Sequence, residues 1–200
     1  MKHLLRLGVL GSGKGSNFRA IMEQITSGRL QAEVRIVISD VEDAGILSLA
    51  RDFQIPALYL HPGRFRTKLE PEVEQDLVRL LREADVEVVV LAGFMRMVKE
   101  PLLTAFPNRI INIHPSLLPK YPGLAAWKQA LEAGEKVAGC TVHLVDRGMD
   151  TGKILAQSSV PILPDDTPEG LHARIQEAEH VLLPKVIAEF GAPQNSGARS

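Results

Sequence analysis

The sequence predicts an α/β fold, in which helices flank a Rossmann-like, mostly parallel twisted sheet with an antiparallel hairpin in the second half. Three observations predict it. Short apolar segments rich in β-branched residues alternate with amphipathic segments, which is the pattern of a parallel sheet with right-handed crossovers. A glycine-rich turn follows the first apolar segment. Two later β-rich segments are joined by a short link that contains glycine, which is typical of a hairpin.

The strands of the parallel part are predicted from their apolar runs. Val86–Leu91 is almost continuously apolar, as expected of a strand that is covered on both faces. Leu4–Leu10 is interpreted as the first strand, because it runs into the glycine-rich turn without the cleavage pattern of a signal peptide. Ala57–Leu60 is a weaker candidate. The remaining strands are Glu33–Ser39 and Arg109–Ile113.

Amphipathic segments between these strands predict helices. Glu70–Ala84 places Leu77, Leu80 and Leu81 on one stripe, with charged residues opposite, so we expect this helix to bury one face. The other two helices are Ser16–Thr26 and Asp43–Phe53.

The second half of the chain changes character. Leu124–Ala133 is predicted as a helix that Gly134 ends. Gly139–Asp146 and Lys153–Val160 are predicted as the two arms of the hairpin. Residues 166–169 then offer a helix cap with proline in the first turn, and the last helix follows over Gly170–Phe190. We expect one domain over residues 1–190 and a flexible tail over 191–200, which is rich in small and polar residues.

Composition excludes several classes of protein. The 200 residues carry 23 basic and 24 acidic side chains, a net charge of −1, so a broad basic face for nucleic acid is not expected. Cys140 is the only cysteine, which excludes intrachain disulfides and cysteine-rich metal sites. The six histidines show no metal-ligand spacing. No apolar stretch of about 18 residues occurs, so we expect no membrane span and a cytoplasmic protein.

Residues 11–17, Gly-Ser-Gly-Lys-Gly-Ser-Asn, follow the first strand and open the first helix. Glycine lets the backbone approach an anion, and the free N–H groups at a helix start favour phosphate. The spacing fits neither the Walker phosphate loop nor the complete dinucleotide fingerprint. Two interpretations stay open for Gly15, Ser16 and Asn17: a phosphate site, or a plain tight turn with a serine cap.

Asn112 and His114 end a predicted strand. Side chains alternate along a strand, so both point the same way, at the edge where open α/β sheets bind ligands. An amide beside an imidazole can stabilise an oxyanion, but a capping Asn and a structural His would look the same. Asp150 in the hairpin link would favour the imidazolium if the hairpin folds back over this edge. Asp146 and His143 are nearby competitors, and Asp is common in turns.

Residues 91–97, Leu-Ala-Gly-Phe-Met-Arg-Met, leave the most apolar strand. Apolar side chains with one arginine can line a cleft for a flat ring. Alternatively, Phe94 and the two methionines belong to the core.

Four blocks together resemble the folate-dependent formyltransferase family, and within it the phosphoribosylglycinamide formyltransferases. They are SGKGSN (12–17), LAGFMR (91–96), INIHPSLLPKYPG (111–123) and GCTVHLVDRGMDTGKILAQ (139–157). The resemblance spans about residues 7–190. It implies transfer of a formyl group from 10-formyltetrahydrofolate to the amine of N1-(5-phospho-D-ribosyl)glycinamide in purine biosynthesis, without a metal.

The resemblance also implies roles for particular residues, with phosphate binding in about 1–108 and folate binding and catalysis in about 109–190. Asn112 and His114 would stabilise the oxyanion, and Asp150 would assist His114 and proton transfer. The phosphate and ribose would be held by Gly15, Ser16, Asn17, Lys68, Gln176 and Glu179. The folate would contact Met95, Arg96, Met97, Val98, Asn112, Val145, Asp146, Met149 and Asp150.

Two positions depart from the pattern of the resembled family. Ala125-Ala126-Trp127 stand where many relatives have histidine, and Lys14 stands where a neutral residue is frequent. Other functions stay open: a formyl-folate hydrolase, a formyltransferase with another acceptor, or a non-catalytic folate- or nucleotide-binding module. The expected partners are small molecules, and the sequence leaves a homodimer open.

Overall fold

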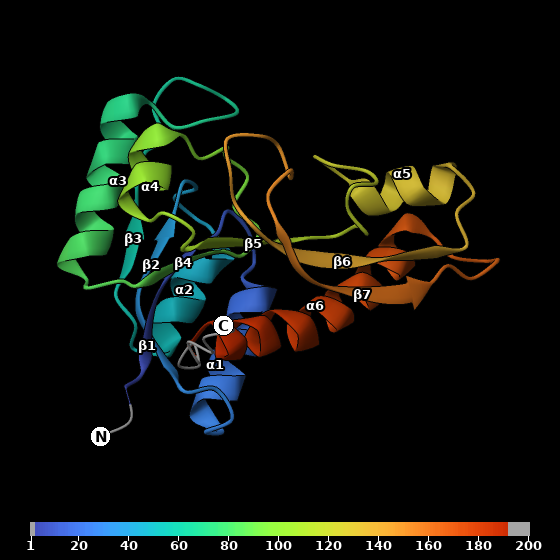
Figure 1. Ribbon diagram of the computed structural model, residues 1–200, viewed down its shortest axis with the longest axis horizontal. Helices are drawn as coiled ribbons and strands as arrows, with labels where there is room; N and C mark the ends of the chain where they lie inside the picture. The colour runs from blue at the N-terminus through green and yellow to red at the C-terminus, as the bar shows by residue number, and fades with distance from the viewer. Residues whose placement is uncertain (1–2, 192–200) are drawn as a thin grey trace, which may run out of the picture.

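The computed structural model describes residues 3–191. Its centre is a seven-stranded sheet in the order β3-β2-β1-β4-β5-β6-β7 (Figure 1). β1 to β5 run parallel, and β6 and β7 extend the sheet in antiparallel fashion, so the predicted fold class is confirmed. The strands are β1 (Leu5–Leu10), β2 (Ala32–Ser39), β3 (Ala57–Tyr59), β4 (Val88–Leu91), β5 (Ile110–His114), β6 (Val137–Leu144) and β7 (Ile154–Pro161). The helices are α1 (Ser16–Thr26), α2 (Gly45–Asp52), α3 (Pro71–Glu83), α4 (Glu100–Ala105), α5 (Ala126–Glu132) and α6 (Pro168–Gly191).

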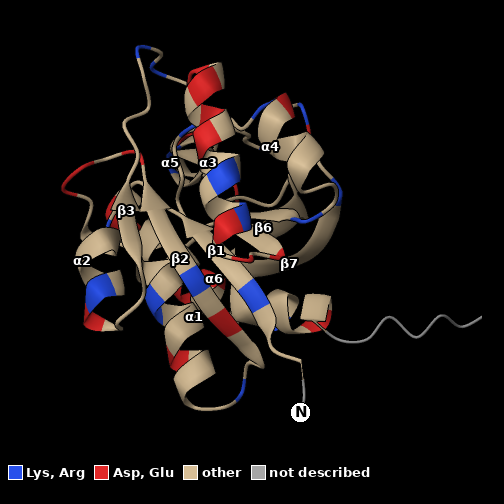
Figure 2. Cartoon of the chain, turned by 90° about the vertical axis from the view of Figure 1, so that its left-hand side faces the viewer, with Lys and Arg blue, Asp and Glu red and all other residues tan. Residues whose placement is uncertain are grey.

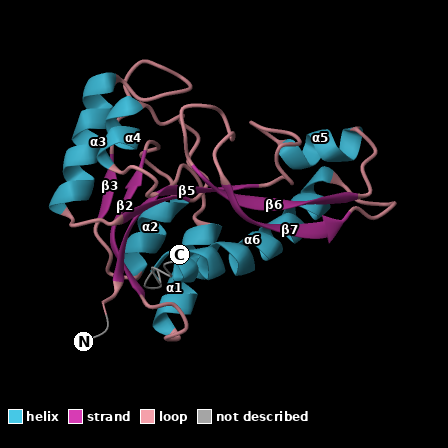
Figure 3. Cartoon of the chain, in the orientation of Figure 1, coloured by secondary structure: helices cyan, strands magenta, loops and turns pink. Residues whose placement is uncertain are grey.

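Helices cover both faces of the parallel part of the sheet (Figure 3). α1, α2 and α6 pack on one face and share the larger core cluster, whereas α3 and α4 pack on the other. On β4, Val88 and Val90 belong to the first cluster, and Val89 and Leu91 belong to the second. A strand whose side chains alternate between two buried faces has to be apolar throughout, which explains the apolar run in the sequence.

Lys and Arg residues are interspersed with Asp and Glu residues along the elements coloured in Figure 2. On α3, for example, Arg79 pairs with Asp76 and Glu83 on the exposed side of the helix. Within residues 3–191, no helix combines the length and the apolar character that crossing a membrane would need.

Several helices begin or end at residues other than those predicted from the sequence. The helix expected from Leu124 begins at Ala126, because Gly123 and Ala125 take left-handed conformations with φ of 84° and 53°. The last helix begins at Pro168, and Thr167 Oγ1 caps it by accepting the Gly170 N–H at 3.1 Å. The sequence pattern does not indicate α4, because so short a segment shows no helical period. The expected tail, residues 191–200, lies outside the described residues except for Gly191, which ends α6.

Gly8 on β1 lets α3 approach the sheet closely. A Cβ atom at this position would lie 2.6 Å from Leu81 Cδ2 and 3.1 Å from both side-chain methyl groups of Val86. Leu81 is fully buried, and a close-packed interior leaves it no free space into which to turn.

We expect Gly8→Ala to lower the free energy of unfolding by about 1–3 kcal/mol, the range for an overpacked core. Leu81→Ala alone should cost roughly 2–5 kcal/mol. The double variant should cost less than the two penalties together, because the added methyl group fills part of the space that Leu81 leaves. Urea denaturation of the four proteins measures this cycle, and strictly additive penalties would contradict the proposed contact.

Candidate active site

A cavity of about 560 Å³ lies at the carboxyl ends of β1, β4 and β5, the edge at which open α/β sheets place their ligand sites. Its walls come from segments that lie far apart in the sequence. They are residues 13–17, 91–98, 112–115, 123–125, 145–146 and 148–150, together with Thr67, Trp127, His143, His172, Gln176 and Glu179.

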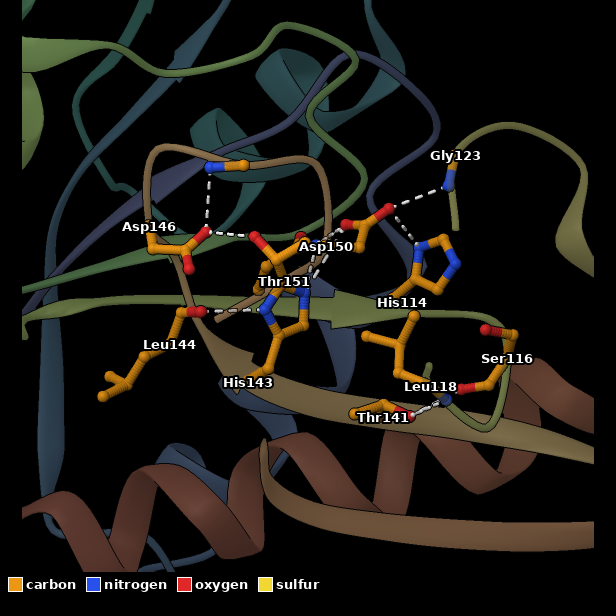
Figure 4. A network of polar contacts seen from close by, with 12 residues as sticks. His114, Ser116, Leu118, Gly123, Thr141, His143, Leu144, Asp146, Asp150 and Thr151 are labelled. Atoms are coloured by element: carbon orange, nitrogen blue, oxygen red, sulfur yellow. Dashed lines mark hydrogen bonds and ion pairs between the residues drawn. The ribbon is translucent and has the colours of Figure 1, made fainter. Parts of the chain in front are cut away.

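Asn112, His114 and Asp150 meet in this cavity. Asn112 and His114 lie on β5, whereas Asp150 lies in the link between β6 and β7. Asp150 Oδ2 lies 3.5 Å from His114 Nδ1 and accepts the Gly123 N–H at 2.8 Å (Figure 4). Asp150 Oδ1 lies 3.5 Å from Asn112 Nδ2. The hairpin link therefore folds back over the edge of the sheet and brings together the three residues that the sequence singles out.

Both ring nitrogens of His114 face hydrogen-bond acceptors. Nδ1 faces the Asp150 carboxylate, and Nε2 lies 2.9 Å from the carbonyl oxygen of Tyr121. A protonated imidazole has two N–H donors, whereas the neutral ring has one. These neighbours therefore satisfy the imidazolium at both nitrogens. The residue is only 5% exposed, so water cannot easily take the place of either acceptor.

His143 belongs to the same cluster, although the sequence analysis treated it only as a competitor of Asp150. The strand register pairs it with Asn112. Its Nδ1 lies 2.8 Å from the Leu144 carbonyl oxygen, and its Nε2 lies 3.1 Å from Asn112 Nδ2. These neighbours assign the proton to Nδ1, so Nε2 accepts from the Asn112 amide and orients it. The sequence signal was a histidine in a mostly apolar strand, which marks the residue but does not identify its partner.

The environment of Asp150 keeps its carboxylate charged. Burial acts to raise the pKa of Asp150, but the hydrogen bond from the Gly123 N–H and the charge of His114 act in the opposite direction and prevail. The pKa of Asp150 therefore lies below its ordinary value. A charged carboxylate at this position stabilises positive charge on the neighbouring His114 imidazole.

The glycine-rich loop gives α1 an open start. Gly15 is the N-cap residue with φ of 83°, and a Cβ atom there would lie 2.9 Å from Ile46 Cγ1. Only glycine fits such a position without strain. No side chain caps α1, and its first turn contains no acidic residue. The N–H groups of the first turn therefore stay available for an anion.

Arg96 lines the cavity, but its guanidinium is bound to neighbouring groups. Its Nε lies 2.7 Å from Asp40 Oδ2, and its Nη1 donates to the Phe65 carbonyl at 2.7 Å. Asp40 also accepts from Ser12 Oγ, which in turn accepts the Met95 N–H at 2.9 Å. This network joins the glycine-rich loop to the segment after β4 and neutralises the charge of Arg96.

A buried polar pair, Asn17 and Glu179, joins the loop to α6. Asn17 Nδ2 donates to Glu179 Oε2 at 2.8 Å, and Asn17 Oδ1 has no partner. Burial raises the pKa of Glu179 to about 7, although the bond from Asn17 acts to lower it. On the same face of α6 lie Gln176 and His172, and the His172 ring stacks on Trp127 with centroids 3.7 Å apart.

Lys68 is the one predicted site residue that does not line the cavity. Its ammonium group lies 4.5 Å from the centroid of the Phe65 ring. All other predicted site residues line the cavity, and Lys14 does so as well. Met95 and Met149 are 59% and 50% exposed there. Across residues 3–191, the His, Cys, Asp and Glu side chains form no group of three that could hold a metal ion.

Comparison with known proteins gives a consistent result. The chain is 40% identical over 195 residues to the phosphoribosylglycinamide formyltransferase of Bacillus subtilis, which covers 98% of this chain and 99% of that protein. It is 46% identical over 187 residues to the trifunctional purine biosynthetic protein adenosine-3 of Drosophila melanogaster, of which it spans only 14%. The crystal structure of glycinamide ribonucleotide transformylase 1 from Symbiobacterium toebii matches with a TM-score of 0.91 and 47% identity, over 96% of this chain and 89% of that one. Residues 5–187 match the Formyl transferase family, and the chain therefore belongs to this family.

Proposed function

We propose that the chain transfers the formyl group of 10-formyltetrahydrofolate to the amine of N1-(5-phospho-D-ribosyl)glycinamide, a step of purine biosynthesis. The convergence of Asn112, His114 and Asp150 in one cavity carries this proposal. The names and the full-length similarity of the bacterial relatives support it. A homodimer and a cytoplasmic location stay predictions from the sequence.

In the proposed reaction, the amine nitrogen bonds to the formyl carbon, and a negative charge develops on the formyl oxygen. His114 Nδ1–H and the Asn112 amide are the donors for this oxyanion, since preorganised donors in a site shielded from water stabilise developing charge. The Asp150 carboxylate faces His114 Nδ1 at 3.5 Å and compensates positive charge on the ring. The attacking amine loses a proton, and N10 gains one as the bond between carbon and N10 breaks, with Asp150 as the group that relays the proton.

The two ends of the cavity suit the two substrates. The N–H groups at the start of α1, with Lys14 beside them, fit a phosphate. Gln176 and Glu179 lie on one face of α6 and fit ribose hydroxyls. Met95, Met97, Val98, Val145 and Met149 give the folate end an apolar wall, which is what a flat ring system requires.

An absorbance assay for deformylation of 10-formyltetrahydrofolate, run with and without the glycinamide ribonucleotide, tests the function. We expect turnover only with the ribonucleotide. Turnover with water alone would identify a hydrolase, and the absence of both reactions would identify a binding module.

Replacement of the oxyanion donor tests the catalytic assignment. Asn112→Ala should lower kcat roughly 10²–10³-fold, the usual effect of losing one such donor, while KM for both substrates stays nearly constant. Asp150→Asn should also lower kcat, because it removes the negative charge that faces His114. Asp76→Asn, on the exposed side of α3, is the control for the loss of a carboxylate. Near-normal turnover of Asn112→Ala would remove its assigned role.

The two candidate cations for the phosphate differ in position. Lys14→Gln should raise KM for the ribonucleotide about two- to fivefold, the value of one exposed ion pair, and added salt should reduce the difference. Lys68→Gln should have a smaller effect, because Lys68 does not line the cavity. Steady-state kinetics at two salt concentrations compares the variants, and the reverse order would assign the phosphate to Lys68.

Glu179 predicts a pH dependence of ribonucleotide binding. Because burial raises its pKa to about 7, Glu179 loses its charge as the pH falls through 7. A carboxylate accepts stronger hydrogen bonds from ribose hydroxyls than a neutral carboxyl group does, so KM should rise as the pH falls. The ribonucleotide phosphate titrates at about pH 6. Glu179→Gln separates the titration of Glu179 from that of the phosphate. The variant should lose the component near pH 7, and an unchanged profile would exclude Glu179 as its source.

A further inference from the structure

Tyr121 connects the proposed catalytic histidine to a residue outside the cavity. Its hydroxyl donates to Glu135 Oε1 at 3.0 Å, and its carbonyl oxygen lies 2.9 Å from His114 Nε2. Glu135 precedes β6, and neither Tyr121 nor Glu135 lines the cavity. A single residue thus joins the catalytic ring to an ion pair near the surface, in which Lys120 Nζ lies 2.7 Å from Glu135 Oε1.

The backbone of Tyr121 is held in an unfavourable conformation. Its φ is 55°, in the left-handed region that bulky residues rarely adopt. Such a conformation persists only where the surroundings hold it, and it is often found at functional sites. Two neighbouring contacts help to hold the loop: Ser116 Oγ donates to the Lys120 carbonyl at 2.6 Å, and the Gly123 N–H donates to Asp150. The Tyr121 ring packs against the larger core cluster, and its hydroxyl is held by the bond to Glu135.

The protonation states of Tyr121 and Glu135 favour a lasting hydrogen bond between them. Burial raises the pKa of the Tyr121 hydroxyl, and the bond to Glu135 raises it further, so the hydroxyl stays a donor. The bonds from Lys120 and Tyr121 lower the pKa of Glu135, so its carboxylate stays an acceptor. Hydrogen bonds to a charged group are the stronger kind.

We propose that Tyr121 is a positioning residue for His114. Its hydroxyl, bound to Glu135, fixes the left-handed backbone, and this backbone aims the Tyr121 carbonyl at His114 Nε2. With Nε2–H bound there, Nδ1 is directed to Asp150 and to the reacting formyl group. The inference rests on the proposed function, in which His114 acts as the imidazolium.

Tyr121→Phe removes the hydroxyl and keeps the ring. We expect kcat to fall at least roughly tenfold, as for the loss of a hydrogen bond to a charged group, with KM for both substrates unchanged. The descending limb of the pH profile of kcat should move to lower pH, because the imidazolium loses a well-placed acceptor. A purely structural role for Tyr121 would lower the melting temperature and leave the pH profile of the folded enzyme unchanged.

Variants of Glu135 and Lys120 supply matched controls. Glu135→Leu removes the acceptor and should behave like Tyr121→Phe. Glu135→Gln keeps an oxygen acceptor for the hydroxyl and should retain most of kcat. Lys120→Gln removes the exposed ammonium group, whose side chain is 61% exposed, and should leave kcat near normal, because exposed ion pairs contribute little.

Nitrogen-15 NMR of histidine-labelled protein reads the His114 ring without any substrate, and His114→Asn assigns its signals. In the parent protein we expect a protonated Nε2, and in Tyr121→Phe we expect exchange between protonation patterns. An unchanged ring spectrum together with unchanged kcat would overturn the proposal. If the parent protein transferred no formyl group, the proposed function would fail, whereas the NMR result would still decide whether Tyr121 positions His114.

Discussion

The carboxylate of Asp150 faces four neighbouring residues. Oδ2 accepts the Gly123 N–H and faces His114, while Oδ1 faces Asn112 and His143. These neighbours come from β5, from β6 and from the loop before α5. A partly buried carboxylate keeps its charge only while donors such as the Gly123 N–H and the Asn112 amide surround it. The hairpin link, the loop and the two strands must therefore hold fixed positions relative to one another for the site to exist.

The antiparallel pairing of β5 with β6 supplies these fixed positions. It sets Asn112 opposite His143 and His114 opposite Thr141. Thr141 is fully buried, and its Oγ1 donates to the Ser116 carbonyl and accepts the Leu118 N–H, so it also holds the loop that follows His114. A shift of the register by one residue would turn His143 to the opposite face of the sheet. The sheet therefore determines the loop geometry on which Tyr121 and Gly123 depend.

Sequence patterns could predict the parallel half of the fold, because apolar strands and amphipathic helices are local features. Asn112 and His114 were also predictable as a pair, since their spacing on a strand fixes a common direction. His143 was not, because its role depends on a strand register that no local pattern reveals. The contact between Tyr121 and His114 depends on a loop with left-handed residues at Tyr121 and Ala125. Neither position carries a glycine, the residue that would indicate such a conformation in the sequence. The helix at 100–105 was too short to show a period.

The chain is nearly neutral overall, and most charged groups that line the cavity are paired with a neighbour. Arg96 pairs with Asp40, and Asp150 faces two imidazoles. Among the cavity-lining residues of the described part of the chain, Lys14 is the only lysine or arginine without an ion pair. A paired charge attracts a distant ion only weakly, so an anionic group is drawn to Lys14 and the start of α1. A flat apolar group gains most where it covers the exposed side chains of Met95 and Met149. The cavity thus distinguishes a phosphate end from an apolar end through charge and burial, before any specific contact with the catalytic residues forms.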